Sequence, residues 1–206
     1  MKIQLNNVGK RYNRDWIFRN FSYTFLPGNS YAIIGPNGSG KSTLLQILSG
    51  AASINEGQCT FFINEQPLAL EKVYTHIAYC APYLELVEEF TLMELLQFHQ
   101  SFKPFLKGVS ADEIAARVEL AHVKHKKISE YSSGMKQRAK LAQSIFSDTP
   151  AVLLDEPCTN LDKAGIDLYH SLIDQYCKNR LILISSNDKT EYSFCSQIID
   201  ITQYKH

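Results

Sequence analysis

The sequence of 206 residues lacks an excess of charge of either sign, because 21 Lys and Arg balance 21 Asp and Glu. A neutral chain has no overall field that would attract nucleic acid or an acidic lipid surface. Long apolar runs are also missing: aliphatic stretches such as "AVLL" and "LILI" fall far short of the roughly 20 residues of a membrane span. The N-terminal "MKIQLNNVGKRYNRDW" has no apolar stretch typical of a signal peptide. We therefore expect a cytoplasmic protein with no membrane span of its own and no nucleic-acid partner.

Cysteine is scarce and scattered, and no two cysteines form a C-x-x-C pair. An odd number of cysteines at this spacing suits neither a zinc site nor a disulfide framework. We expect reduced thiols, and three of them lie in or beside apolar segments, where a small apolar side chain fills core space. The five residues are Cys59, Cys80, Cys158, Cys177 and Cys195.

What the sequence does contain is an alternation of short apolar strands and helical patterns, in a composition of 45% hydrophobic and 20% charged residues. Such a composition is typical of a globular protein, and the alternation predicts an α/β fold with a largely parallel sheet. Residues 83–131 differ, because their helical patterns carry charged clusters and no convincing strand, which indicates a helical insertion. The predicted strands are "IQL" near the start, 18–25, 31–34, 59–63, 76–80, 151–155, 181–185 and 197–201, and the predicted core helices are 41–50, 133–146 and 162–177.

The segment "GPNGSGKST" lies between a predicted strand and a predicted helix, and it fits the phosphate-loop pattern G-x-x-x-x-G-K-[ST]. Glycines let the backbone approach an anion closely, and the loop amides together with the helix N-terminus form a preformed phosphate site. Lys41 is expected to neutralise charge on the β- and γ-phosphates, and the Ser42 hydroxyl to bind Mg²⁺. The segment therefore predicts a nucleotide site made of Gly35, Pro36, Asn37, Gly38, Ser39, Gly40, Lys41, Ser42 and Thr43.

Two adjacent carboxylates, Asp155 and Glu156, follow four apolar residues in the segment "AVLLDEP". They would repel each other and resist burial unless a cation lay beside them. Mg²⁺ held by Ser42 supplies that cation. Asp155 is then predicted to support the metal through its water shell, and Glu156 to accept a proton from the attacking water.

Four elements in this order resemble the ATPase subunit of ATP-binding cassette (ABC) transporters. They are "GPNGSGKST" as the Walker A loop, "YSSGMKQR" as the signature, "AVLLDEP" as Walker B and "TNLD" as the D-loop. The resemblance covers essentially the whole chain and implies a single cassette over residues 1–206. Within it, 1–82 and 132–206 would form a P-loop NTPase core with a mainly parallel sheet and an antiparallel N-terminal β-subdomain. Residues 83–131 would form the helical subdomain that docks on a membrane partner.

The resemblance also implies roles for the signature and the D-loop. Ser132, Ser133 and Gly134, at the start of a helix, would meet the γ-phosphate bound to the opposite subunit. Tyr131, Ser133 and Met135 depart from the family form Leu-Ser-Gly-Gly-Gln, whereas Ser132 and Gly134 keep their places. Asp162 of the D-loop would lie in the turn that faces the opposite subunit.

Three further positions are compared with the family. Tyr12 matches the aromatic residue that stacks on adenine, and the nearby Trp16 could do the same. The family glutamine that contacts Mg²⁺ is replaced by Pro82, for which Glu85 is a weak substitute. The family histidine that contacts the γ-phosphate is replaced by Asn187, whose amide can still donate a hydrogen bond. The resemblance implies that this replacement slows hydrolysis, and we expect Glu156, Lys41 and Asn187 to determine turnover.

The resemblance implies a subunit that binds and hydrolyses ATP with Mg²⁺ and pairs head to tail with a second cassette, as a homodimer or heterodimer. It would power a separate membrane permease from the inner face of the cell membrane. Two alternatives stay open. Asn187 and Pro82 motivate a slow-hydrolysing or binding-only cassette that acts as a switch. A soluble non-transport ABC ATPase is the other, although such proteins usually carry two cassettes with a linker or long coiled coils, which this sequence does not contain.

Overall fold

The structure, a computed structural model that describes residues 1–205, divides the chain into two compact units. The first unit contains Met1–Tyr79, Pro150–Glu156 and the C-terminal residues from Asn179 onward. The second contains Cys80–Thr149 and Pro157–Lys178. The segment 83–131 thus shares its unit with later helices, and the three-part division expected from the sequence stays a prediction.

One layer of the first unit is a four-stranded antiparallel sheet in the order β2-β1-β4-β5. Ile3 of the central strand β1 pairs with Phe25 on one side and with Phe61 on the other, and all three side chains are buried. Asn64 and Glu65, with φ of 48° and 63°, form the two-residue turn between β4 and β5. The strands are β1 Lys2–Tyr12, β2 Asp15–Phe25, β4 Glu56–Ile63 and β5 Gln66–Leu68.

The second sheet has five strands in the order β6-β7-β8-β3-β9. β8 lies between β7 and β3, and the pairs β7–β8, β8–β3 and β3–β9 are all parallel. Every residue of β7 and β8 is buried, which explains why these strands appear in the sequence as unbroken apolar runs. The strands are β3 Ser30–Ile34, β6 Ile77–Cys80, β7 Ala151–Asp155, β8 Leu181–Ser185 and β9 Gln197–Asp200. The predicted α/β fold, with a mainly parallel sheet and an N-terminal antiparallel sheet, is confirmed.

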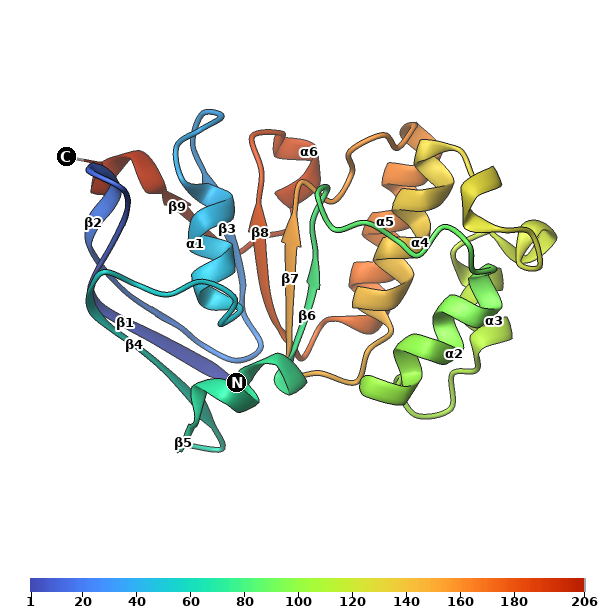
Figure 1. Ribbon diagram of the computed structural model, residues 1–206, viewed down its shortest axis with the longest axis horizontal. Coiled ribbons are helices and arrows are strands. Elements are labelled where there is room, and N and C mark those ends of the chain that lie inside the picture. The colour runs from blue at the N-terminus through green and yellow to red at the C-terminus, as the bar shows by residue number, and fades with distance from the viewer. Residues whose placement is uncertain (206) are drawn as a thin grey trace. The chain divides into compact units, whose positions relative to one another are not determined.

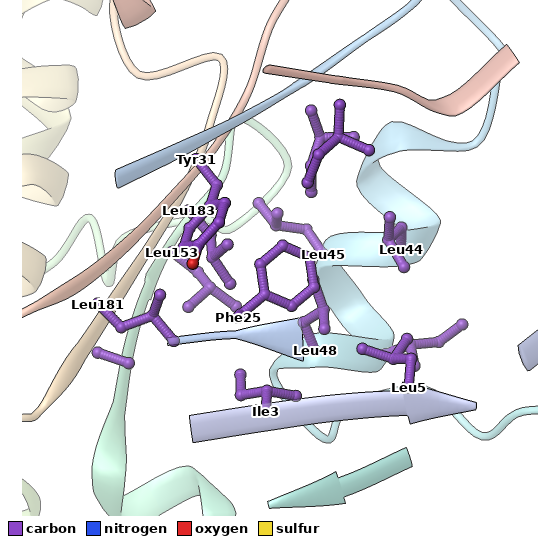
Figure 2. Close-up of a cluster of buried hydrophobic side chains, with 14 of the residues drawn as sticks. Ile3, Leu5, Phe25, Tyr31, Leu44, Leu45, Leu48, Leu153, Leu181 and Leu183 are labelled. Atoms are coloured by element: carbon purple, nitrogen blue, oxygen red, sulfur yellow. The ribbon is translucent and has the colours of Figure 1, made fainter. Parts of the chain in front are cut away.

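Helix α1, Lys41–Leu48, packs between the two sheets of the first unit (Figure 1). Its residues Leu44, Leu45 and Leu48 are fully buried. Burying one such side chain is worth about 1.5–3 kcal/mol, so this contact fixes the helix that begins at the phosphate loop. Figure 2 shows these leucines in one cluster with Ile3, Leu5 and Phe25 of the antiparallel sheet and Tyr31, Leu153, Leu181 and Leu183 of the parallel sheet.

The second unit is helical, and α4 and α5 lie side by side in it (Figure 1). Thr91 and Ser110 each form a capping box, with Glu94 and Glu113 respectively, which satisfies free backbone N–H groups where α2 and α3 begin. The α-helices of this unit are α2 Leu92–Phe102, α3 Ala111–Arg117, α4 Ser133–Ile145 and α5 Lys163–Tyr176, and the 3-10 turns η2 Ala121–Val123 and η3 Ile128–Glu130 lie between α3 and α4.

Several short elements were not expected from the sequence: β5, the 3-10 helices η1 Leu70–His76 and η4 Ile201–Tyr204, and α6 Lys189–Tyr192. Across residues 1–205 no helix is both long and apolar enough to cross a membrane. No disulfide joins the five cysteines, which all lie within the described residues, and Cys80, Cys158 and Cys177 are buried.

Candidate functional site

Three neighbouring strands bring candidate site residues to one edge of the parallel sheet. β3 runs into the phosphate loop, β7 ends at Asp155, and β8 ends at Ser185. Because β8 lies between the other two, the segments that follow these strands are neighbours at the carboxyl edge of the sheet. Backbone hydrogen bonds connect them: Glu156 N–H donates to Ser185 O at 2.8 Å, and Ser186 N–H donates to Ile33 O at 3.2 Å.

The phosphate loop ends at Gly40, directly before α1. Gly40 has φ 103°, and a Cβ atom there would lie 2.4 Å from Cγ2 of Ile17, so the position requires glycine. No described side chain caps the first turn of α1, which leaves its amide groups available to an anion. The hollow beside the loop has a volume of about 370 Å³ and is lined by Ile17, Asn37, Gly38, Ser39, Gly40, Lys41, Ser42, Thr43 and Glu156.

Lys41 is the buried cation of this hollow, with 5% of its surface exposed. Its ammonium group donates to the backbone oxygens of Gly35 at 2.8 Å and Pro36 at 3.4 Å. Burial lowers the pKa of Lys41, and the negative charges of Glu156 and Asp155 oppose that shift. Neutral carbonyl groups hold the ammonium, so it can still pair with an anionic ligand.

Asp155 is 2% exposed, and its Oδ1 atom has no hydrogen-bond partner among the described residues. Burial raises its pKa, against the influence of the Ser42 and Ser185 hydroxyls and of the Lys41 charge. A buried carboxylate oxygen without a partner is costly, and carboxylate and hydroxyl oxygens are ligands that Mg²⁺ prefers. Residues 1–205 contain no group of three or more His, Cys, Asp or Glu that could hold a metal, so further ligands would have to come with a bound phosphate. Ser42 and Asp155 fit a magnesium ion that enters with a nucleotide.

Two residues that follow strands lie at the phosphate loop. Glu156 lines its hollow and has φ 43°, a left-handed conformation that costs energy for a residue other than glycine. Asn187 is exposed, and its Nδ2 donates to Oδ1 of Asn37 at 2.6 Å. The structure therefore brings Asn187 to the phosphate loop through a side-chain contact that the sequence did not indicate.

Two aromatic residues are the candidates for adenine stacking: Tyr12 at the end of β1 and Trp16 near the start of β2. The ring of Trp16 is contacted by two guanidinium groups, with Cζ of Arg19 at 4.3 Å and Cζ of Arg11 at 5.4 Å from its centroid. Tyr12 is 48% exposed. Neither ring lines the phosphate hollow, whereas Ile17 does. The sequence did not predict that Ile17 lines this hollow. Strand alternation shows which residues share a face of the strand, but it does not show which loop packs against that face.

The signature residues begin helix α4 in the second unit. Ser132 caps the helix, since its Oγ accepts from the backbone N–H three residues later at 3.3 Å. A Cβ atom at Gly134 would lie 3.0 Å from the backbone oxygen of Asn160, so the neighbouring D-loop restricts this position to glycine unless the loop shifts. Asp162 caps α5 in the same way, accepting from the Gly165 N–H at 2.8 Å. The hollow here, of about 360 Å³, is lined by Glu119, Leu120, His122, Ser132, Ser133, Gly134, Met135, Arg138, Asn160, Leu161 and Asp162.

Two side chains stabilise the signature segment. Arg138 pairs with Glu119, and its Nη2 lies 3.7 Å from Oδ1 of Asp162. Tyr131 is buried and donates its hydroxyl proton to the backbone oxygen of Val123 at 2.9 Å. A tyrosine can therefore occupy the position of the family leucine, because its polar end is satisfied.

Pro82 and Glu85 line a third hollow, of about 450 Å³, in the second unit. Lys140 of α4 donates to the backbone oxygen of Pro82 at 2.8 Å, and Lys136, one turn earlier, pairs with Glu88. The main chain at position 82 thus bonds to the signature helix, although its side chain has no polar atom. The sequence did not predict these contacts of Lys136 and Lys140, because lysines one turn apart on a helix usually form a solvated face.

The phosphate loop, the buried Asp155 with Ser42, and Glu156 at the carboxyl edge of a parallel sheet define a P-loop NTPase fold.

Residues 18–159 match the family described as ABC transporter. The ABC transporter ATP-binding protein YybJ of Bacillus subtilis (strain 168) is 30% identical over 210 residues, which are 97% of this chain and 92% of YybJ. An ABC transporter ATP-binding protein from Pyrococcus furiosus has the same fold, with a TM-score of 0.83 at 23% identity over 100% of both chains. A dimeric bacterial ABC transporter cassette has a TM-score of 0.81 at 22% identity, covering 97% of this chain and 94% of that one. This chain belongs to the ABC transporter family, whose cassettes bind ATP and generally hydrolyse it.

Proposed function

We propose that this chain binds ATP with Mg²⁺ in the phosphate-loop hollow, hydrolyses it and powers a separate membrane permease. One observation carries the proposal: Oδ1 of the buried Asp155 has no hydrogen-bond partner within residues 1–205, and Asp155 belongs to the same group of strand and loop ends as Ser42, Lys41 and Glu156. Such an arrangement is unfavourable without a ligand and becomes favourable when a cation and phosphates enter.

Each residue of the hollow has a distinct role in this proposal. The amides of Gly38–Thr43 and the Lys41 ammonium bind the phosphates, while Ser42 and Asp155 hold Mg²⁺, Asp155 through its water shell. Bound Mg²⁺ neutralises negative charge on the phosphates. Glu156 accepts the proton of the attacking water, and Asn187 donates a hydrogen bond to the γ-phosphate.

Tyr12 is proposed to stack on adenine. Tyr12 is 48% exposed, and among the described residues the single cation at its ring is Lys10, whose Nζ lies 4.9 Å from the ring centroid. Trp16 is a poorer choice, because two guanidinium groups already contact its ring.

A second cassette is proposed to complete the site. Ser132, Ser133, Gly134 and Asp162 would serve the nucleotide bound to the other subunit, as the signature and D-loop do in the resembled family. The exposed side chains of Ser132, Ser133 and Asp162 support this role, and one solved cassette of the same fold is dimeric.

A membrane permease is the proposed partner, and the ATPase would then lie on the inner face of the cell membrane. The names of the relatives as ABC transporter ATP-binding proteins support it. Copurification of a tagged chain from detergent-solubilised membranes tests this part. A polytopic membrane protein in fixed stoichiometry is expected, and a chain recovered without one contradicts the role.

A second candidate function is a switch that binds ATP and dimerises but hydrolyses it slowly. The observation that favours it is the amide of Asn187 at the position of the family histidine, since an amide has neither the geometry nor the proton chemistry of imidazole.

The proposal is tested by the ATPase rates of the purified wild-type chain and of Glu156→Gln, each measured with and without Mg²⁺. We expect Mg²⁺-dependent turnover in the wild type, a loss of about 100-fold or more in the variant, and retained ATP binding with a more persistent dimer. Equal turnover in both proteins contradicts the role of Glu156. ATP binding with a barely measurable wild-type rate favours the switch.

A further inference from the structure

The side chains of Asn37 and Asn187 form a contact between two segments far apart in the sequence. Nδ2 of Asn187 donates to Oδ1 of Asn37 at 2.6 Å, across 150 positions of the chain. Asn37 lines the phosphate hollow, so the contact holds Asn187 at the edge of that hollow. Among the described residues, no other group forms a hydrogen bond with the Asn187 side chain.

The backbone on both sides of Asn187 is already held. Ser186 is 1% exposed, and its N–H donates to Ile33 O on the strand that leads into the phosphate loop. Asp188 donates its N–H to Oγ of Ser186 at 2.9 Å, and its carboxylate caps α6 through the Thr190 N–H at 2.8 Å. The remaining freedom at position 187 is therefore rotation of the exposed side chain, which the contact with Asn37 restricts.

The chemistry of an amide makes this restriction matter. The Asn187 amide has two N–H donors and one oxygen acceptor, and one N–H is used by Asn37. The second N–H and the oxygen remain for a ligand in the hollow. Without a partner the amide plane can turn over, so that its oxygen instead of its N–H group faces the ligand. A phosphate oxygen is an acceptor and forms no hydrogen bond with the amide oxygen.

We propose that Asn37 is a positioning residue that orients the amide of Asn187 toward the nucleotide phosphates. This inference rests on the proposed ATPase function. Asn37 thus acts through its side chain as well as through its place in the phosphate loop. Asn187 offers the hydrogen bond to the phosphates, and Asn37 holds the Asn187 amide in the required orientation.

A double-mutant cycle in the full chain tests the pair, using wild type, Asn37→Ala, Asn187→Ala and the double variant with MgATP. We expect each single variant to lower kcat about 10-fold, the lower end of the range for loss of a supporting partner, with KM changed less than about 3-fold. The double variant should be no slower than the slower single variant, because both substitutions remove one contact. Multiplicative losses in the double variant, or an effect of Asn37→Ala on KM alone, would overturn the proposal.

A second measurement does not need turnover. The side-chain NH₂ signals of Asn187, identified by their disappearance in Asn187→Ala, are followed by ¹H–¹⁵N NMR in the nucleotide-free protein. Asn37→Ala should shift them and increase their mobility, while Asn29→Ala, an asparagine outside the hollow, should leave them unchanged. Unchanged Asn187 signals in Asn37→Ala contradict the pair.

The two hypotheses fail in different ways. If the wild type neither binds nor hydrolyses ATP, the proposed function is wrong. If Glu156→Gln is inactive and the losses in the cycle multiply, the proposed function stands and the role of Asn37 is wrong.

Discussion

The phosphate hollow and the signature hollow differ in how deeply their functional groups are buried. Lys41 and Asp155 of the phosphate hollow are 5% and 2% exposed. The side chains of Ser132 and Asp162 in the signature hollow are exposed. Buried charges interact strongly because little water screens them, whereas exposed groups contribute little until another surface covers them. The phosphate hollow is therefore organised for a ligand within one chain, and the signature hollow fits a role that needs a second one.

The helix starts show the same difference. α1 begins after Gly40 with no capping side chain among the described residues, whereas Ser132 caps α4. Free amide groups at α1 are ready for an anion, but at α4 one of them is already satisfied by the serine hydroxyl. A ligand at α4 has to add to a helix that is stable without it.

The largest expected effect comes from removing the buried cation. Lys41→Ala should raise the dissociation constant for ATP by about 100-fold, because hydrogen bonds from a buried charged group to phosphate are lost. Isothermal titration calorimetry measures this. Lys72→Ala, which removes an exposed lysine of η1, is the matched control and should bind ATP as the wild type does. Equal affinity in Lys41→Ala would show that the phosphate hollow is not the ATP site.

A change in the signature hollow should separate turnover from binding. Gly134→Ala places a Cβ atom 3.0 Å from the Asn160 oxygen and displaces the D-loop backbone. We expect turnover to fall about 10-fold while the isolated chain binds ATP unchanged. Gly108→Ala controls for glycine loss in the same unit without a steric contact: nothing lies within 4 Å of that Cβ position, and its φ of 77° adds a local backbone strain that Gly134→Ala does not have. Weaker ATP binding by monomeric Gly134→Ala would mean that the two hollows are not independent.

Neutralising Asp155 should stabilise the protein and impair its function. Asp155→Asn removes a buried charge whose Oδ1 has no partner among the described residues, so the nucleotide-free chain should gain about 1 kcal/mol, or roughly 2–4 °C in Tm. Mg²⁺-dependent turnover should fall in the same variant. Calorimetry at neutral pH measures the gain, and a lower Tm would contradict a costly carboxylate at this position.

The stability gain of Asp155→Asn should depend on pH. Burial raises the pKa of Asp155 above its ordinary value of 3.8, so the folded chain keeps this proton to a higher pH than the unfolded chain. Ionisation of Asp155 therefore removes stability as pH rises from about 3.8 through the folded-state pKa. The difference in unfolding free energy between variant and wild type should be small at acid pH and grow toward neutral pH. A difference that is the same at every pH would assign the gain to packing.

The smallest expected effect is at the cap of α4. Ser132→Ala removes the hydrogen bond to the helix N–H and should cost about 0.5–1 kcal/mol in the free energy of unfolding, as for other N-caps. Denaturant unfolding measures it. Ser133→Ala, one residue into the helix, should cost less, because Ser133 is not the cap. A larger loss in Ser133→Ala would place the helix start elsewhere.

Local motifs predicted much of this protein. The phosphate loop, the strand 151–155, the strand 181–185 and the helix starts at Ser132 and Asp162 could be found because glycine spacing, buried strands and caps have short-range sequence patterns. The contacts of Ile17, of Lys140 with Pro82, and of Asn37 with Asn187 could not be found in this way. Each joins segments whose separation along the chain says nothing about their distance in space.

The sequence alone determined the family, the α/β fold and the order of the motifs, because these depend on residue types at fixed short spacings. The tertiary structure decided which groups meet: strand order placed the loop ends after β3, β7 and β8 beside one another, and packing left Asp155 buried with an oxygen that lacks a partner among the described residues. Whether a carboxylate is a solvated surface charge or a candidate metal ligand depends on burial and on its neighbours, which only the folded chain provides.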